Sequence, residues 1–224
     1  MRDRFRNIKA IFLTGLIIFG FMIQGGHANA QAREELIVAG GCFWCVESDF
    51  DSVRGVQEAI SGFAGGSTAN PTYKQVSRGG TGHYEAVRIL YDPSRVSRDQ
   101  LLSLFFRSVD PTDSGGQFCD RGDSYRTAVF VGDDAEKTAA ELAKTNAEAD
   151  LGQKVVTPIL PKSDFYPADA FHQDYYKGKK IVLTRFGPKR QFKAYKAYRQ
   201  ACGRDARVME LWGADAPFVK KYLN

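Results

Sequence analysis

The stretch ELIVAGGCFWCVESDF, residues Glu35–Phe50, decides the fold of this chain. It begins with a short apolar run that is typical of a buried strand. Gly40 and Gly41 then permit a sharp turn, and apolar residues follow at positions 43, 46 and 50, on one face of a helix. The stretch therefore predicts a strand that turns directly into a helix, with Cys42 at the helix N-terminus.

Downstream of this stretch the sequence predicts further strands, two further helices and two Gly-rich loops. The predicted strands are 55–63, 84–91, 125–131 and 155–160; the helices begin at Ser97 and Asp133; the loops span 64–83 and 110–123. Ser97 with Gln100 and Asp133 with Glu136 have the spacing of helix N-terminal caps.

The order of these elements is strand, helix, strand, strand, helix, strand, which resembles a split βαβ unit. The predicted fold class is therefore α+β: a two-layer sandwich with a split βαβ (ferredoxin-like) core, a mostly antiparallel sheet and an extended C-terminal tail. The helices are expected on one face of the sheet. The basic and aromatic residues of 185–224 are interpreted as a tail that wraps around the core.

The N-terminus has the three-part pattern of a secretory signal peptide. Four basic residues within the first nine positions precede an apolar run over 10–23, and Ala28-Asn-Ala30 is a small-x-small cleavage site. The apolar run is shorter than the roughly 20 residues that a membrane-spanning helix needs. We therefore expect a cleaved signal peptide at 1–30, a periplasmic or secreted location, and a single catalytic domain at 31–224 with its core at about 36–180.

Charge and composition exclude some classes of partner. Without residues 1–30 the chain has 27 basic and 25 acidic residues, a net charge of +2, and its sequence contains no basic stripe of the kind that binds nucleic acid. No long exposed apolar stripe appears either. The expectations are no nucleic acid, no membrane contact after signal removal, and a monomer.

Cys42 has the position of a reactive thiol. The free N–H groups and partial positive charge of a helix N-terminus favour a thiolate, so a lowered pKa is expected for Cys42. The aromatic pair Phe43 and Trp44 beside it is suited to an apolar group. Cys45 completes a Cys-x-x-Cys pair and is a redox partner, half of a zinc site or a buried spectator. Because the remaining His and Cys residues form no second close pair, no metal is expected.

The segment Gly40-Gly-Cys-Phe-Trp-Cys-Val-Glu47 resembles the active-site element of the A-type peptide methionine sulfoxide reductases. Further segments that resemble this family follow in the same order along the chain. They are Gly65-Gly-Ser-Thr-Ala-Asn-Pro-Thr-Tyr73, Gly82-His-Tyr-Glu-Ala-Val-Arg88, Gln117-Phe-Cys-Asp-Arg-Gly-Asp-Ser-Tyr-Arg126 and Phe171-His-Gln-Asp-Tyr-Tyr176. The resemblance covers about 36–180, most of the chain that remains after removal of the signal peptide.

The resemblance implies a reaction and a role for each matching residue. Cys42 attacks the sulfur of methionine S-oxide, and Glu85 protonates the departing oxygen. The resemblance further implies that Tyr73 and Tyr125 form hydrogen bonds to that oxygen and that Asp120 supports the site. It also implies that Phe43 and Trp44 contact the S-methyl group. A Cys42 sulfenic acid then condenses with a second thiol to form a disulfide.

The implied activity is that of a peptide-methionine (S)-S-oxide reductase that repairs oxidised proteins or free methionine sulfoxide. No bound cofactor is expected, because the electrons come from a thioredoxin-like dithiol donor. The resolving thiol stays open between Cys45, three residues away, and Cys202, in the tail. Cys119 is expected to be buried beside the site.

Two other classes of function remain as alternatives. An exported thioredoxin-like disulfide oxidoreductase also has a Cys-x-x-Cys pair after a strand, here Cys42 and Cys45. A non-catalytic secreted module stapled by two disulfides is the other, and it predicts no free thiol in the native protein. Reduction of insulin disulfides, rather than of a sulfoxide, distinguishes the first alternative.

Overall fold

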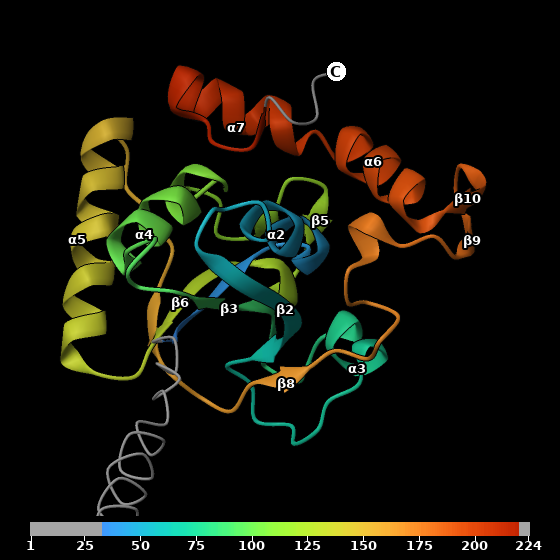
Figure 1. The fold of residues 1–224 in the computed structure, drawn as a ribbon, viewed down its shortest axis with the longest axis horizontal. Helices are drawn as coiled ribbons and strands as arrows, with labels where there is room; N and C mark the ends of the chain where they lie inside the picture. The colour runs from blue at the N-terminus through green and yellow to red at the C-terminus, as the bar shows by residue number, and fades with distance from the viewer. Residues whose placement is uncertain (1–32, 220–224) are drawn as a thin grey trace, which may run out of the picture. The chain divides into compact units, whose positions relative to one another are not determined.

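A computed structural model describes residues 33–219 of the chain (Figure 1). The predicted signal peptide at 1–30 lies outside the described residues. Among the helices of 33–219, none has the length and apolar character that crossing a membrane requires.

The centre of the described chain is a six-stranded sheet in the order β7-β6-β1-β3-β2-β8. Every neighbouring pair is antiparallel except β6 and β7, so the predicted mostly antiparallel sheet is confirmed. The strands are β1 Glu34–Gly40, β2 Val56–Ala64, β3 Tyr84–Tyr91, β6 Thr127–Val131, β7 Ile159–Pro161 and β8 Tyr166–Pro167.

Both faces of the sheet are buried, because alternate residues of β1 enter two different apolar clusters. Leu36 and Val38 belong to the larger cluster, to which the helices contribute, whereas Ile37 and Ala39 belong to a smaller one covered by Phe165. The helices that pack into the larger cluster are α2 Phe43–Phe50, α4 Arg98–Arg107, α5 Asp134–Leu151 and α7 Arg204–Trp212. The mixed α+β class predicted from the sequence is therefore confirmed.

The predicted helix caps are present. The Ser97 side chain accepts a hydrogen bond from the Gln100 N–H, and the Gln100 side chain accepts one from the Ser97 N–H in return. Asp133 likewise accepts from the Glu136 N–H at the start of α5. Satisfying these otherwise unpaired N–H groups fixes where both helices begin.

The loops contain more structure than the sequence predicts. The predicted loop 64–83 contains a short helix, α3 Tyr73–Arg78, and 110–123 contains a small hairpin of β4 Gly116–Gln117 and β5 Asp120–Arg121. Tyr125 belongs to a 3-10 turn, Asp123–Tyr125, instead of the following strand. The last predicted strand, 155–160, is shortened at its start and extends by one residue at its end, to Ile159–Pro161.

The described part of the C-terminal tail is ordered secondary structure that packs on the core. After a 3-10 turn at Tyr175–Lys177 come a hairpin of β9 Ile181–Thr184 and β10 Gly187–Arg190, then α6 Gln191–Cys202, α7 and a last 3-10 turn at Gly213–Asp215. Figure 1 shows α6 and α7 lying across one end of the core, above α2. The tail therefore closes over the helix that begins at Cys42.

Candidate active site

Cys42 lies at the junction of β1 and α2, as the sequence predicts. It is the N-cap residue of α2, and its carbonyl accepts a hydrogen bond of 3.0 Å from the Cys45 N–H. Gly41 has φ +80°, a conformation that side chains disfavour, and a Cβ added there would lie 2.6 Å from the Gln117 Cβ. Glycine is therefore required where the backbone passes closely beneath Gln117.

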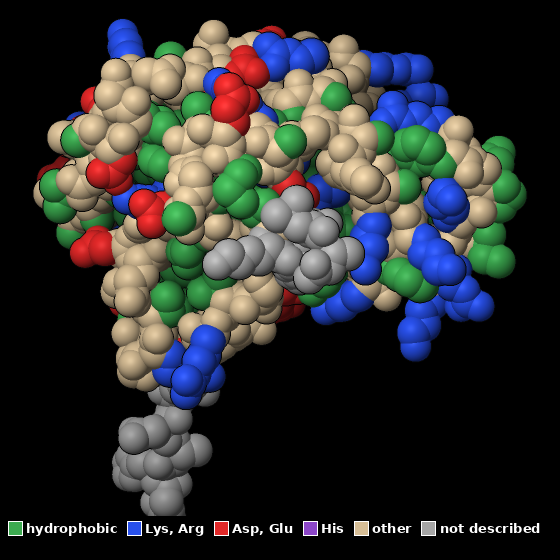
Figure 2. All heavy atoms as spheres, turned by 90° about the horizontal axis from the view of Figure 1, so that it is seen from above, with side chains coloured by type: hydrophobic (Ala, Val, Ile, Leu, Met, Phe, Trp, Pro, Cys, Tyr) green, Lys and Arg blue, Asp and Glu red, His purple; other side chains and the backbone are tan. Residues whose placement is uncertain are grey.

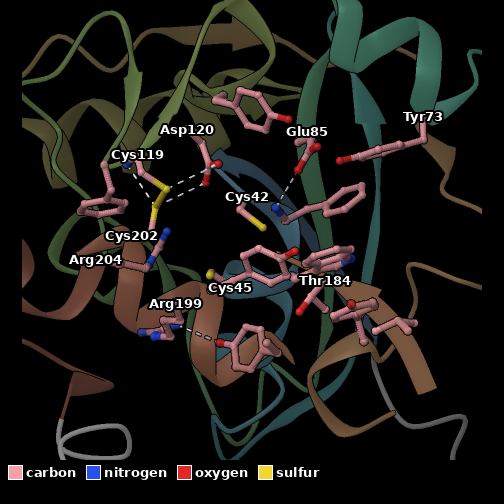
Figure 3. Close-up of a pocket in the computed structure, with 18 of the residues that line it drawn as sticks. Cys42, Cys45, Tyr73, Glu85, Cys119, Asp120, Thr184, Arg199, Cys202 and Arg204 are labelled. Atoms are coloured by element: carbon pink, nitrogen blue, oxygen red, sulfur yellow. Dashed lines mark hydrogen bonds between the residues drawn. A yellow bond between two sulfur atoms is a disulfide. The ribbon is translucent and has the colours of Figure 1, made fainter. Parts of the chain in front are cut away.

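A cavity of about 370 Å³ surrounds Cys42 (Figure 3). Its walls come from segments far apart in sequence: α2, α3, β3, the β4–β5 hairpin, β9 and α6. All nine predicted site residues line it: Cys42, Phe43, Trp44, Cys45, Tyr73, Glu85, Asp120, Tyr125 and Cys202. The fold thus brings the whole predicted set to one place.

The two thiols of the Cys-x-x-Cys pair are hydrogen-bonded to each other and interact strongly. That hydrogen bond, together with burial and the charges of Glu85 and Asp120, raises the pKa of Cys42 well above its ordinary value. The same hydrogen bond lowers the pKa of Cys45 to about 7, and the positive charges of Arg199 and Arg204 contribute to this lowering. In the resting dithiol the more acidic thiol is Cys45.

The lowered pKa expected for Cys42 from its helix N-terminus is therefore wrong for this state. A helix N-terminus contributes about half a positive charge, whereas a buried thiol beside a second thiol and two carboxyl groups meets larger opposing effects. The free energy of ionising the pair is shared, so one proton leaves readily and the second with difficulty.

Glu85 extends from β3 into the cavity and has only 2% of its surface exposed. Burial raises the pKa of its carboxyl group to about 8, although a hydrogen bond from the Phe43 N–H, 3.0 Å from Oε2, favours the charged form. Phe43 directly follows Cys42 in the chain, so this bond holds the carboxyl group beside the thiol. At neutral pH the group is mostly protonated and able to donate a proton.

Tyr73 and Tyr125 meet at the cavity from different elements and are hydrogen-bonded to each other. Burial raises the pKa of both phenols, so both remain protonated donors at any physiological pH. Asp120 also lines the cavity, and burial raises the pKa of its carboxyl group against the lowering effect of Arg204 and Arg185. The two phenols therefore give the site two hydrogen-bond donors.

Cys119 and Cys202 form a disulfide across a sequence separation of 83 residues, while Cys42 and Cys45 are free thiols. Cys119 is exposed, so the expectation that it is buried beside the site is wrong. It lies at the cavity rim, because it belongs to the loop between β4 and β5 that α6 approaches from above. Cys202 is occupied by this bond in the structure.

The aromatic pair at the site has two different environments. Phe43 is 1% exposed and packs among core residues, whereas Trp44 is partly exposed and stacks on Tyr175 with ring centroids 3.7 Å apart. His172 stacks on the other rings at 5.7 Å from Trp44 and 4.2 Å from Tyr73. Trp44 thus forms an apolar wall with a fixed orientation.

Several residues that complete the cavity are not predicted as site residues from the sequence. They are Thr184, at the end of β9, and Tyr195, Tyr198, Arg199 and Arg204, which come from the tail. His172 and Tyr175 lie in Phe171–Tyr176, a segment that resembles the family but to whose residues the resemblance assigns no role. For Arg199 and Arg204 the signal was only their position near Cys202.

A dithiol beside a buried, protonated carboxyl group and two phenols, in a largely apolar cavity, defines a thiol-dependent oxidoreductase. Comparison with known proteins identifies its family. Residues 34–205 match the family model for peptide methionine sulfoxide reductase, and the chain belongs to this family.

Individual relatives agree with this assignment. The chain is 45% identical over 200 residues to peptide methionine sulfoxide reductase MsrA 2 of Rhizobium meliloti, covering 88% of this chain and 94% of the relative. It is 43% identical over 209 residues to MsrA 2 of Caulobacter vibrioides, covering 93% and 99%.

Solved structures show the same likeness. Methionine sulfoxide reductase A of Corynebacterium diphtheriae matches with a TM-score of 0.61 and 30% identity, over 69% of this chain and 79% of that one. The reduced form of Mxr1 from Saccharomyces cerevisiae matches with a TM-score of 0.63 and 29% identity, over 66% and 87%. The activity is thiol-dependent reduction of methionine sulfoxide to methionine, that of a peptide-methionine (S)-S-oxide reductase.

Proposed function

We propose that Cys42 is the nucleophile of this reaction and Glu85 its acid. The observation that carries the proposal is the Phe43 N–H bond to Glu85, which holds a carboxyl group of pKa about 8 beside the thiol. Cys42 loses its thiol proton as its sulfur attacks the sulfoxide sulfur, and Glu85 gives its own proton to the oxygen, which otherwise leaves poorly. The proton from Cys42 then restores the Glu85 carboxyl group. Methionine is released, and the oxygen ends on Cys42 as a sulfenic acid.

The remaining polar residues of the cavity act on the same oxygen. The hydroxyl groups of Tyr73 and Tyr125 hydrogen-bond it as negative charge develops, and their high pKa values keep them protonated throughout. Asp120 supports this arrangement from the β4–β5 hairpin, while Trp44, with Phe43 behind it, contacts the S-methyl group. The support for these roles is that all of these side chains line one cavity.

We further propose that Cys45 resolves the sulfenic acid. Cys45 is hydrogen-bonded to Cys42 and has the lower pKa of the pair, about 7, so a thiolate is available beside the sulfenic sulfur. Its attack forms a Cys42–Cys45 disulfide, and the sulfenic hydroxyl group leaves as water with the proton of Glu85. Cys202, the other candidate, is bonded to Cys119 and has no free thiol in this state.

Turnover requires two electrons from outside the chain. A thioredoxin-like dithiol donor reduces the Cys42–Cys45 bridge and becomes a disulfide itself. We propose free methionine sulfoxide and oxidised polypeptides as substrates, a monomer as the working form, and no resident cofactor or metal, since thiols alone carry the electrons.

We also propose that the chain is exported and that residues 1–30 are removed. The basic, apolar and small-x-small pattern supports this, and a disulfide between Cys119 and Cys202 suits an oxidising compartment. A mature protein that begins at Gln31 in the periplasmic or secreted fraction is the expected result. Retention of the intact N-terminus in the cytoplasm contradicts it.

For the core we propose the split βαβ, ferredoxin-like arrangement. The support is that β1 and β2 are connected through α2 and both pair antiparallel with β3 between them, while β3 and β6 both pair with β1. In the proposed topology the active-site turn is the first crossover of the unit, and residues 31–224 form a single catalytic domain.

The test of the reaction is a single turnover with residues 31–224, in which Cys119–Cys202 is left oxidised and Cys42 and Cys45 are reduced. One equivalent of methionine should form from N-acetyl-methionine sulfoxide, two thiols should disappear, and the new bridge should map to Cys42–Cys45. The Cys202→Ser variant is the matched control and should give the same bridge. A Cys42–Cys202 bridge refutes the assignment of Cys45, and no methionine refutes the reaction.

A further inference from the structure

The hairpin of β9 and β10 exposes an unusually apolar surface beside the catalytic cavity. Ile181 and Leu183 are 72% and 86% exposed, although both are large aliphatic residues in a regular strand. Across the hairpin they pair with Arg190 and Pro188, which are also exposed. These four residues are called the hairpin face below. An aliphatic cluster left in water next to a binding cavity is typical of an interaction site.

The hairpin face is continuous with the cavity because side chains alternate along β9. Val182 and Thr184 line the cavity from the opposite side of the strand, and Leu183 lies at its mouth. A molecule that contacts the hairpin face is therefore one strand's thickness from the space in front of Cys42. Figure 3 shows Thr184 directed to the cavity that Cys42 and Cys45 share.

The outer edge of β9 offers backbone hydrogen bonds. Pro188 has no N–H, so its pairing with Leu183 is a position at which the two strands exchange no hydrogen bond. The N–H and C=O of Leu183 consequently point away from β10. Within residues 33–219, β9 has no strand partner on that side. Such an edge can accept an extended peptide as an additional strand.

The segment around the hairpin is strongly basic. Residues 175–204 contain ten Lys or Arg and no Asp or Glu. Lys177 is paired with the exposed Asp174, whereas Arg199 and Arg204 are paired with the buried Asp49. Among the described residues no ion pair is present for the remaining seven, which are Lys179, Lys180, Arg185, Lys189, Arg190, Lys193 and Lys196. In Figure 2 blue and green side chains gather together at the right of the molecule, where β9 and β10 lie.

We propose that the hairpin face and the outer edge of β9 bind an extended, acidic segment of an oxidised polypeptide, whose methionine sulfoxide side chain enters the cavity. The proposal rests on the proposed function and names its preferred substrate class. An added strand directs alternate side chains to opposite sides, so the sulfoxide faces Cys42 while its neighbours contact Ile181 or the basic residues. An extended segment fits an open strand edge, which a folded partner meets only if it too presents an unpaired strand.

The experiment compares kcat/KM for three substrates: N-acetyl-methionine sulfoxide, a nonapeptide with central methionine sulfoxide and acidic flanks, and the same peptide with lysine flanks. In Ile181→Ser the ratio of acidic-peptide to free-substrate kcat/KM should fall about tenfold, because burial of an isoleucine is lost. Leu142→Ser, which removes an aliphatic residue 58% exposed on α5, is the matched control and should leave the ratio unchanged.

Two further measurements test the contributions of charge and of backbone hydrogen bonds separately from that of the Ile181 side chain. At low salt, kcat/KM for the acidic peptide should be at least tenfold higher than for the lysine-flanked peptide, and this difference should shrink at high salt. N-methylation of the peptide bonds beside the sulfoxide should lower kcat/KM about tenfold without any change to the protein.

An unchanged ratio in Ile181→Ser, or equal rates for both flanks, overturns the proposal. A different outcome is that Ile181→Ser slows turnover only when the dithiol donor is limiting, with no change in the single-turnover ratio of acidic peptide to free substrate. That result assigns the hairpin face to binding of the reductant and also overturns the proposal. Absence of turnover with N-acetyl-methionine sulfoxide in the unmodified protein refutes the proposed function. In that event, fluorescence anisotropy of fluorescein-labelled acidic peptide still tests whether the peptide binds the hairpin face, since Ile181→Ser should weaken its binding about tenfold.

Discussion

Glu85→Gln should remove most of the activity and at the same time stabilise the protein at alkaline pH. Glutamine keeps an oxygen that accepts the Phe43 N–H bond, so the cavity retains its shape. It has no acidic proton to give to the sulfoxide oxygen. Loss of general acid catalysis lowers kcat by about 100-fold to 10,000-fold.

The gain in stability follows from the raised pKa of Glu85. Burial shifts it from the usual 4.5 to about 8, so between these two pH values the folded protein holds a proton that the unfolded chain has lost. The free energy of unfolding therefore falls as pH rises through this window, by about 1.4 kcal/mol per pH unit, and roughly 3–5 kcal/mol is the ceiling at pH 8. Glutamine removes this loss because it does not ionise.

Urea unfolding of both proteins at pH 5 and pH 8 measures the effect. The free energies of unfolding of the unmodified protein and Glu85→Gln should differ little at pH 5. At pH 8 the value for Glu85→Gln should be higher by up to several kcal/mol. The activity of the unmodified protein should fall as pH rises through about 8, as Glu85 ionises. A variant with turnover within a few-fold of the unmodified protein, or with the same stability difference at both pH values, refutes this account of Glu85.

Three further substitutions test other parts of the site. Cys45→Ser should still give one equivalent of methionine in a single turnover but no new disulfide, which thiol counting and mass spectrometry check. Gly41→Ala should destabilise the fold by about 1–3 kcal/mol in urea unfolding, because φ is +80° and the new Cβ meets Gln117; unchanged stability contradicts this. Tyr73→Phe should lower kcat about tenfold or more with little change in stability, since a hydroxyl group that contacts the oxygen is lost; an unchanged kcat removes Tyr73 from the site.

Features that depend on neighbouring residues were predicted well from the sequence. The apolar run before Gly40, the turn and the helix after Cys42 follow from local pattern, and so does the N-terminus of α4 at Ser97. The short helix α3 was missed, although Thr72 and Gln75 form a capping box there. Its six residues bury only Val76, so no helical apolar repeat distinguishes it from a Gly-rich loop.

Features that depend on distant residues were not predictable in the same way. The Cys119–Cys202 bond joins positions 83 residues apart, and four cysteines allow three pairings that sequence alone does not rank. The pKa of Cys42 was predicted in the wrong direction because the helix argument considers its own helix alone. Glu85 comes from β3 and Asp120 from β5, and their combined effect with Cys45 exists only in the folded chain.

The tail, expected as a wrapping segment, is joined to the active-site turn by two buried arginines. Arg199 on α6 donates to both oxygens of Asp49 on α2, at 3.0 and 3.1 Å, and Arg204 donates to the carbonyls of Gly40 and Ser108. Asp49 is 1% exposed in its side chain, so its charge depends on this partner. Folding of the tail and formation of the turn that holds Cys42 are therefore coupled.

Arg199→Met tests this coupling, because it leaves Asp49 buried without its closest cation. The expected loss is about 3–5 kcal/mol in urea unfolding, and the double variant with Asp49→Asn should recover a large part of it. If Arg199 only stabilises the fold, its replacement should not change the pKa of Cys45. Since Arg199 lowers the pKa of Cys45, the pH at which iodoacetamide reacts with Cys45 should also rise in Arg199→Met. An unchanged alkylation profile in a folded variant means that the tail holds the fold together without making the resolving thiol more acidic.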